Sequence, residues 1–144
     1  MAVNPVPNGY HTITPYLIIN EAQKFIDFLI KAFDAVLMDI SRTPEGVIRH
    51  AEIRIGDSMM MLTEATEQYT ASPGHFYLYV NDIDSVYKQA LSAGATSIME
   101  PADQFYGDRN AGVKDSFGNI WWIGTHIEDV SSDEIKKREA ELKK

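Results

Sequence analysis

PYLIINEAQKFIDFLIKAFDA (residues 15–35) and FYLYVNDIDSVYKQALSAGA (residues 76–95) share one pattern. Each begins with a short apolar strand, passes through an asparagine (Asn20 or Asn81) and continues as a helix whose apolar residues recur at helical spacing. Such self-similarity predicts two copies of one structural unit. We expect both asparagines to cap the helices, since an amide oxygen accepts a hydrogen bond from a first-turn N–H. Gly94 suits the left-handed residue that ends the second helix.

Three strand-like stretches follow each predicted helix, at residues 36–41, 47–55 and 58–63 in the first half and 96–99, 111–114 and 120–124 in the second. A longer loop is expected at residues 101–109. Each half therefore reads as β-α-β-β-β. We expect a single domain over residues 1–144, made of module 1 (about 12–63), a linker (64–73), module 2 (about 74–127) and a tail (128–144). Ser131 and Glu134 have capping-box spacing, which predicts a helix in the tail.

Composition excludes several classes of function. Lysine and arginine number 13 against 21 aspartates and glutamates, and a net charge of −8 repels nucleic acid. The absence of cysteine excludes disulfides, thiolate metal sites and cysteine nucleophiles, and it fits a reducing compartment. No apolar run approaches the ~18–20 residues of a membrane span, and residues 1–10 lack the pattern of a signal peptide. We therefore expect a cytoplasmic protein that binds neither nucleic acid nor a membrane.

Several motifs carry a family likeness: TPYL (14–17), IDF (26–28), HAEIRIGD (50–57), QFYGDR (104–109), DSFGN (115–119) and TH (125–126). On these motifs, spread over about residues 12–127, the chain resembles the glyoxalase/bleomycin resistance/dioxygenase superfamily, also called vicinal oxygen chelate proteins. Within it the chain is similar to the PhnB-like group. The resemblance implies an α+β fold in which two paired βαβββ modules form curled mixed sheets around a central cleft, with a C-terminal helical tail. It also implies a small-molecule ligand and a homodimer.

Metal-dependent members of that superfamily place His, Gln or Glu at one position in each of four strands. The positions that match here are Thr14, Met61, His75 and Trp122. Only His75 could bind a metal, and one imidazole is too few ligands for a divalent ion. We therefore expect no metal and no other cofactor.

The resemblance places six side chains in the cleft, and we expect them to contact the ligand: Thr14, Tyr16, Met61, His75, Tyr77 and Trp122. The set combines apolar walls with a few polar groups, as ligand pockets do. By the same register Trp121 faces the helix layer. Trp122 either stacks on a planar or aromatic ligand or fills a small closed cavity. Arg109 either grips a carboxylate or phosphate of the ligand or pairs with Asp108 to organise its loop.

Three residues are candidates for catalysis. His75 either contacts the ligand as a proton donor or is hydrogen-bonded to a neighbouring tyrosine. His50 and Glu52 share one strand face, where they could form a charged pair, ligate a metal or simply be solvated. Two functions follow. One is a protein that binds a small planar or aromatic molecule without a metal. The alternative is a lyase, isomerase or dioxygenase-type enzyme that uses a divalent metal, or His75 and Glu52 as acid and base.

Overall fold

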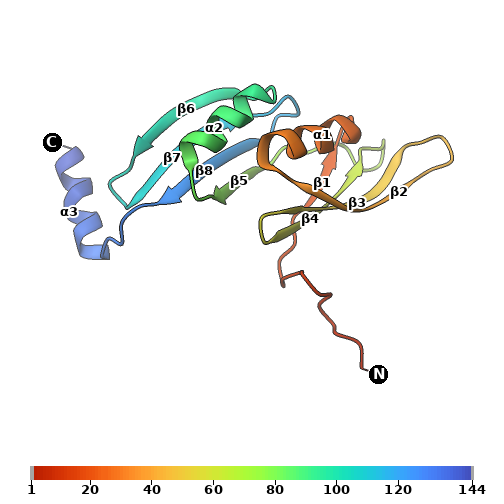
Figure 1. The fold of residues 1–144 in the computed structure, drawn as a ribbon, viewed down its shortest axis with the longest axis horizontal. Coiled ribbons are helices and arrows are strands. Elements are labelled where there is room, and N and C mark those ends of the chain that lie inside the picture. The colour runs from red at the N-terminus through yellow and green to blue at the C-terminus, as the bar shows by residue number, and fades with distance from the viewer. Residues whose placement is uncertain (1, 144) are drawn as a thin grey trace. The chain divides into compact units, whose positions relative to one another are not determined.

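Two four-stranded sheets, each with one helix packed on one face, make up the fold (Figure 1). The computed structural model describes residues 2–143. The boundary between two compact units lies between Gly74 and His75. The first unit contains β1 (Tyr16–Ile19), α1 (Ala22–Phe33), β2 (Val36–Arg42), β3 (Ile48–Ile55) and β4 (Ser58–Glu64). The second contains β5 (His75–Tyr79), α2 (Ile83–Ser92), β6 (Thr96–Asp103), β7 (Asp108–Lys114), β8 (Ile120–His126) and α3 (Ser132–Leu142).

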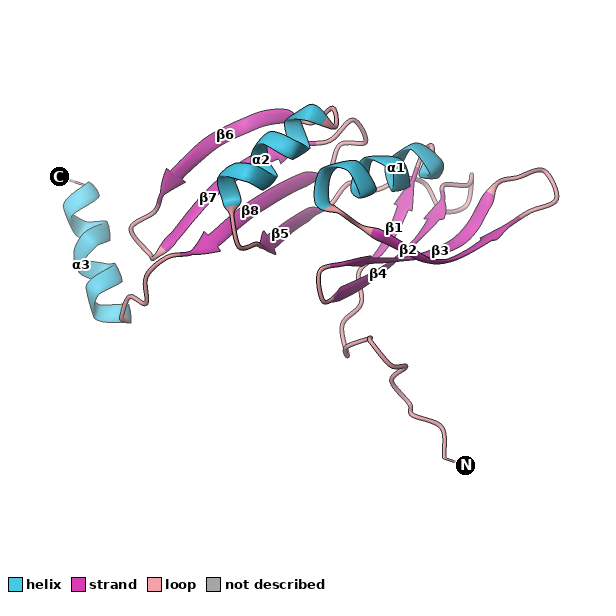
Figure 2. Ribbon diagram, in the orientation of Figure 1, coloured by secondary structure: helices cyan, strands magenta, loops and turns pink. Residues whose placement is uncertain are grey.

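Both sheets have the same topology, β1-β4-β3-β2 in the first unit and β5-β8-β7-β6 in the second. The pairs β1–β4 and β5–β8 are parallel, and the remaining pairs are antiparallel, so both sheets are mixed (Figure 2). The predicted fold class, two βαβββ modules followed by a C-terminal helix, is confirmed. Within residues 2–143, no helix has the length and apolar character that crossing a membrane requires.

Each sheet buries one face beneath its helix. In the first unit α1 buries Phe25, Ile26 and Leu29, and the sheet contributes Ile53 and Leu62. In the second unit the buried layer includes α2 residues Ile83, Tyr87 and Ala90 with Val113, Trp121 and Ile123 of the sheet. Burying each large side chain stabilises the fold by roughly 1.5–3 kcal/mol. The opposite face of each sheet carries the partly exposed side chains from which a site can be built.

The prediction that Asn20 and Asn81 cap the helices is wrong. The N-cap of α1 is Glu21, which has a φ of 58° and no side-chain cap of its own. Instead the Glu64 carboxylate at the end of β4 accepts hydrogen bonds from the backbone N–H groups of Glu21 (2.9 Å) and Ala22 (3.0 Å). The parallel pairing of Ile19 with Glu64 brings that carboxylate to the helix.

The second helix is capped in a related way. Its N-cap is Asp82, whose side chain accepts a hydrogen bond from Ser85 N at 3.3 Å. The Thr125 hydroxyl, near the end of β8, accepts from Ile83 N (3.0 Å) and donates to Val80 O (2.8 Å). The prediction for Gly94 is confirmed, because it follows α2 with a φ of 110°.

The expected loop over residues 101–109 is also wrong. β6 continues to Asp103 and β7 begins at Asp108, so only a short turn joins them. Gln104 N donates to Asp108 O at 2.7 Å and closes this turn. Pro101 favours a loop in the sequence pattern, because a proline lacks the N–H that a strand residue donates. Here it lies in an edge strand, which tolerates it.

The tail forms the predicted helix, α3. Its N-cap is Ser131, whose hydroxyl accepts from Glu134 N at 3.2 Å. Arg138 attaches α3 to the rest of its unit by donating to Phe105 O (3.0 Å) and to the Glu128 carboxylate (2.8 Å). None of the described residues of α3 is buried, so polar contacts hold this helix. Met1 and Lys144, the ends of the expected domain, lie outside the described residues.

Candidate functional site

The open face of the second sheet gathers aromatic and polar side chains. Side chains alternate along a strand, and the pairings Tyr77–Trp122 and Gly112–Trp122 place these residues on one face across three strands. We call His75, Tyr77, Tyr79 and Trp122 the aromatic face. Residues from the neighbouring strands share this side of the sheet: Asp108, Asn110, Gly112, Gly124 and His126.

The two tryptophans point in opposite directions, as their register predicts. Trp121 is 1% exposed, stacks on Phe76 with ring centroids 4.5 Å apart, and donates its indole N–H to Asp115 at 2.8 Å. Trp122 lies on the open face, and its indole N–H donates to His75 Nδ1 at 3.3 Å. Its ring lies against Gly112, where an added Cβ would come within 2.6 Å of it. Glycine at that position therefore lets the indole lie flat on the sheet.

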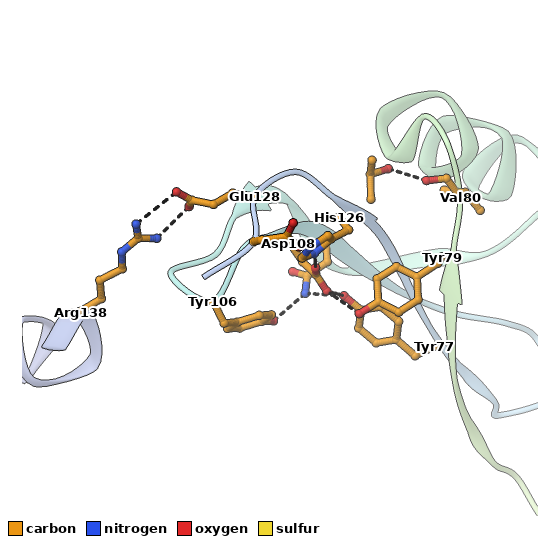
Figure 3. A network of polar contacts seen from close by, with 11 residues as sticks. Tyr77, Tyr79, Val80, Tyr106, Asp108, His126, Glu128 and Arg138 are labelled. Atoms are coloured by element: carbon orange, nitrogen blue, oxygen red, sulfur yellow. Dashed lines mark hydrogen bonds and ion pairs between the residues drawn. The ribbon is translucent and has the colours of Figure 1, made fainter. Parts of the chain in front are cut away.

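A buried carboxylate organises the tyrosines of the aromatic face (Figure 3). Asp108 is 5% exposed. Its Oδ2 accepts hydrogen bonds from the hydroxyls of Tyr77 (2.8 Å) and Tyr79 (2.9 Å), and its Oδ1 lies 2.9 Å from His126 Nδ1. The other ring nitrogen of His126 lies 2.7 Å from Asp129. Three donors thus converge on one carboxylate and hold both phenol rings in place.

The protonation states in this cluster follow from these contacts. Burial would raise the pKa of Asp108, but hydrogen bonds from His126, Tyr77 and Tyr79 outweigh it and lower that pKa. Hydrogen bonds to Asp108 and Asp129 raise the pKa of His126. Burial raises the pKa of Tyr77, and the hydrogen bond to Asp108 raises that of Tyr79. The cluster therefore holds an ionised carboxylate beneath two neutral phenols.

Asn110 has an unused acceptor at the centre of the cluster. Its Nδ2 donates to the hydroxyls of Tyr106 (2.7 Å) and Tyr77 (3.1 Å). The Tyr77 hydroxyl donates its single proton to Asp108, so it must accept the hydrogen bond from Asn110. This fixes the orientation of the Asn110 amide. Among residues 2–143, the Asn110 Oδ1 has no hydrogen-bond partner, although the residue is only 3% exposed. A buried acceptor without a partner costs roughly 1–3 kcal/mol.

The first unit carries its own predicted residues on the open face of its sheet. The register aligns Tyr16, Met61 and Glu52 across β1, β4 and β3. Thr14 precedes β1, is half-buried and donates to His11 O at 3.4 Å. His75, Tyr77 and Trp122 belong to the second unit and lie together there.

The acid–base candidates of the first unit are engaged with one another and with Tyr10. His50 Nε2 lies 4.0 Å from the Glu52 carboxylate. The Tyr10 hydroxyl donates to Glu52 as well. Burial, followed by this hydrogen bond, raises the pKa of Tyr10 to about 12. The sequence pattern does not predict Tyr10 as a site residue, because Tyr10 precedes the strands and belongs to no periodic pattern.

Arg109 does not join the aromatic face. Its neighbours on β7, Asp108 and Asn110, lie on the open face, so Arg109 points toward the helix side. Its guanidinium donates to Asp84 of α2 through Nε (3.1 Å) and Nη2 (3.0 Å), and to Asp103 through Nη1 (3.1 Å). These three bonds use most of the planar donor fork.

Five residues of the cluster were missed as site candidates: Tyr79, Tyr106, Asp108, Asn110 and His126. Four of them lie in strands, and strand alternation from Tyr77 and Trp122 would have reached Tyr79 and His126. The sequence pattern puts Asp108 in the expected loop and Asn110 at its edge. Extending β7 by three residues would have placed both on the open face.

Comparison with known proteins places the chain in a family. Residues 9–123 match the model of the Glyoxalase/Bleomycin resistance protein/Dioxygenase superfamily. The chain belongs to this superfamily. It is 35% identical over 147 residues to the Mycobacterium bovis protein Mb0911c, covering 94% of both chains.

Solved structures of the superfamily fold match as well. TioX from Micromonospora sp. ML1 matches with a TM-score of 0.70 and 24% identity, over 81% of this chain and 99% of that one. A PhnB protein from Bacillus cereus, described as a putative 3-demethylubiquinone-9 3-methyltransferase, matches with a TM-score of 0.60 and 19% identity, over 80% and 99%. At these identities the likeness concerns the fold.

The residues at the superfamily's metal positions do not fit a divalent ion. Thr14 offers a hydroxyl and Met61 a thioether, and the indole of Trp122 has no lone pair to donate. His75 alone is a good ligand, and its Nδ1 already accepts a hydrogen bond from Trp122. Over the described part of the chain, no group of three or more histidines and carboxylates is arranged to hold a metal ion. We therefore derive no chemistry through a metal at these positions.

Proposed function

We propose that this superfamily member binds a small planar or aromatic molecule, without a metal, on the aromatic face of the second sheet. One observation carries the proposal. His75, Tyr77, Tyr79 and Trp122 lie side by side on a sheet face that no helix of their unit covers, and Tyr77 and Tyr79 are 40% and 66% exposed. Exposed clusters of large apolar rings mark binding surfaces. Flat rings with a few polar groups between them suit a planar ligand.

The rings are held in place before any ligand arrives. Tyr77 lies against Gly124, where an added Cβ would meet its hydroxyl at 2.5 Å, and Trp122 lies against Gly112 in the same way. Hydrogen bonds to Asp108 anchor Tyr77 and Tyr79, and His75 anchors Trp122. Since these side chains are already ordered, little conformational entropy is lost when a ligand binds.

The resemblance to the superfamily supports the remaining predicted contacts. Thr14, Tyr16 and Met61 of the first unit stay proposed ligand contacts on that ground. Arg109 stays a prediction from the sequence alone, because it points to the helix side of the sheet and its guanidinium donates to Asp84 and Asp103. In this proposal His75 acts as a ligand contact. Because its Nδ1 accepts from Trp122, the neutral ring carries its proton on Nε2, which is free to donate.

Tryptophan fluorescence tests the proposal. We expect 4-nitroanisole, a planar neutral quencher, to quench part of the emission saturably in wild type and in Trp121→Phe, which keeps Trp122 as the single reporter. Trp122→Ala should abolish the saturable part, because the remaining Trp121 is buried beneath α2. The proposal would be refuted if the saturable quenching were lost in Trp121→Phe and kept in Trp122→Ala. It would also be refuted if all three proteins were quenched in the same way as free N-acetyltryptophanamide.

A further inference from the structure

We infer that the molecule recognised by the aromatic face is an organic cation. The inference rests on the proposed function, because it concerns the same four residues, and it specifies the charge of the ligand. Three features of the described residues support it: the polarisation of two phenol rings, the buried charge beneath them, and the position of the nearby cationic side chains.

The first feature is the pair of tyrosines. The rings of Tyr77 and Tyr79 have centroids 4.9 Å apart and an interplanar angle of 47°, and both remain partly exposed. Both hydroxyls donate to the same oxygen of Asp108. A phenol that donates to a carboxylate gains electron density in its ring, which strengthens the negative potential of the ring face. Such faces attract ammonium-type ligands, and Trp122 next to Tyr77 adds a third ring.

The second feature is the buried negative charge. Asp108 is 5% exposed, so solvent and salt screen it weakly. His126 lies between Asp108 and Asp129, so even a protonated His126 leaves this trio with one net negative charge. The Oδ1 of Asn110, which has no hydrogen-bond partner among residues 2–143, adds a further negative dipole. Because three donors already occupy the Asp108 oxygens, the carboxylate acts on a ligand through its field and not as a metal ligand.

The third feature is where the cations lie. Arg109, the arginine of β7, points to the helix side and is paired with Asp84 and Asp103. Lys114 shares the open face in the row of Ile120 and His75, at the end of the aromatic face that lies six residues along β7 from Asp108. His126 lies beside Asp108, but it is held between Asp108 and Asp129. Among the described residues near Asp108, an anionic ligand would therefore meet cations that are already paired, whereas a cation meets complementary charge. The net charge of −8 favours the same sign of ligand.

Three small benzene derivatives test the inference by equilibrium dialysis at pH 8. Trimethylphenylammonium is a permanent cation, N,N-dimethylaniline is its near-isosteric neutral analogue, and benzenesulfonate is an anion. We expect the wild-type protein to bind the cation about 3- to 30-fold more tightly than the neutral analogue, the range that a cation–π interaction supplies. Benzenesulfonate should bind more weakly than either.

Tyr79 provides the discriminating variants, because it is 66% exposed and its replacement leaves the core intact. Tyr79→Leu removes the ring without changing the net charge and should reduce the preference for the cation to less than twofold. Tyr79→Phe keeps the ring, loses the bond to Asp108 and should give an intermediate preference. Tyr69→Leu is the matched control, since Tyr69 is 60% exposed in the linker, and it should retain the wild-type preference.

The outcomes separate this inference from the proposed function. Equal binding of the cation and the neutral analogue, both lost in Trp122→Ala, overturns the cation inference and leaves the aromatic site standing. A cation preference that survives Tyr79→Leu also overturns it, because attraction by the overall charge would then suffice. Saturable quenching by 4-nitroanisole without any binding of trimethylphenylammonium would likewise overturn the cation inference and leave the aromatic site standing. Circular dichroism and thermal midpoints verify that each variant is folded.

Discussion

A single histidine side chain, that of His126, connects the aromatic face with the segment that leads to α3. Its two ring nitrogens lie 2.9 Å from Asp108 and 2.7 Å from Asp129, so only the doubly protonated ring satisfies both carboxylates. The charged and titratable groups around it are Asp108, Asp129, Tyr77 and Tyr79. Asp108 stays ionised and both tyrosines stay neutral near neutral pH, because the pKa of Asp108 is lowered and those of the tyrosines are raised. His126 is therefore the group of this cluster whose charge changes near neutrality.

We expect the stability of the protein to fall as pH rises through the pKa of His126. A folded-state pKa above the unfolded value of about 6.5 means that the contribution is complete below pH 6.5 and is lost as pH passes the raised value. Urea unfolding at several pH values between 5.5 and 8.5 measures the slope of the free energy of unfolding against pH. His126→Gln keeps a polar side chain but cannot ionise, and it should flatten the curve. The same slope in His126→Gln as in wild type would contradict the assignment.

At the scale of elements, both helices take a cap from the last strand of their own module. Glu64 closes α1 and Thr125 closes α2, and each lies three residues after the position shared by Met61 and Trp122. A carboxylate at a helix N-terminus satisfies orphan N–H groups and complements the helix dipole. The βαβββ unit therefore ties its helix to the strand that pairs with β1 or β5.

Removing the cap of α1 should destabilise the protein measurably. We expect Glu64→Ala to lower the free energy of unfolding by about 1–2 kcal/mol, since two backbone donors lose their partner. Glu21→Ala is the control: Glu21 contributes a surface ion pair with Lys24, which is worth little. Urea denaturation followed by circular dichroism measures both. If both substitutions lowered the free energy of unfolding equally, the Glu64 cap would contribute no more to stability than a surface ion pair does.

At the scale of the whole molecule, the assembly remains a prediction from the superfamily. β2 is an edge strand, and it exposes Val36, Leu37 and Met38 by 42%, 39% and 49%. Exposed apolar edge strands favour pairing with another chain. α3 offers a second surface, because none of its described residues is buried.

We expect the protein to be a homodimer in solution. Multi-angle light scattering at micromolar concentration should give twice the 16.2 kDa of one chain. If β2 supplies the contact, Met38→Lys should shift the mass toward that of one chain, while a chain ending at Val130 should keep the dimer. If α3 supplies the contact, the chain ending at Val130 should have the mass of one chain, while Met38→Lys should keep the dimer. A mass of 16.2 kDa for the unmodified protein would contradict the prediction.

The sequence by itself determined the repeated βαβββ order and the opposite directions of Trp121 and Trp122. The superfamily resemblance added that Thr14, Met61 and Trp122 stand where metal-dependent members carry ligands. The βαβββ order and the directions of the tryptophans depend on periodicity, which is local and can be read along the chain. Alternation also placed His75 and Tyr77 on one face of their strand, whereas the placement of Trp122 with them came from the superfamily resemblance.

Only the tertiary structure decided which groups meet. Tyr77 and His126 reach Asp108 from 31 and 18 residues away, and Glu64 reaches α1 from 42 residues away. Arg109, expected at a ligand, pairs with Asp84 from 25 residues away. Such contacts are set by strand pairing and by the direction in which each helix returns, and no local pattern encodes them. Sequence periodicity therefore identified the faces of the sheets, and the pairing of the strands determined the site.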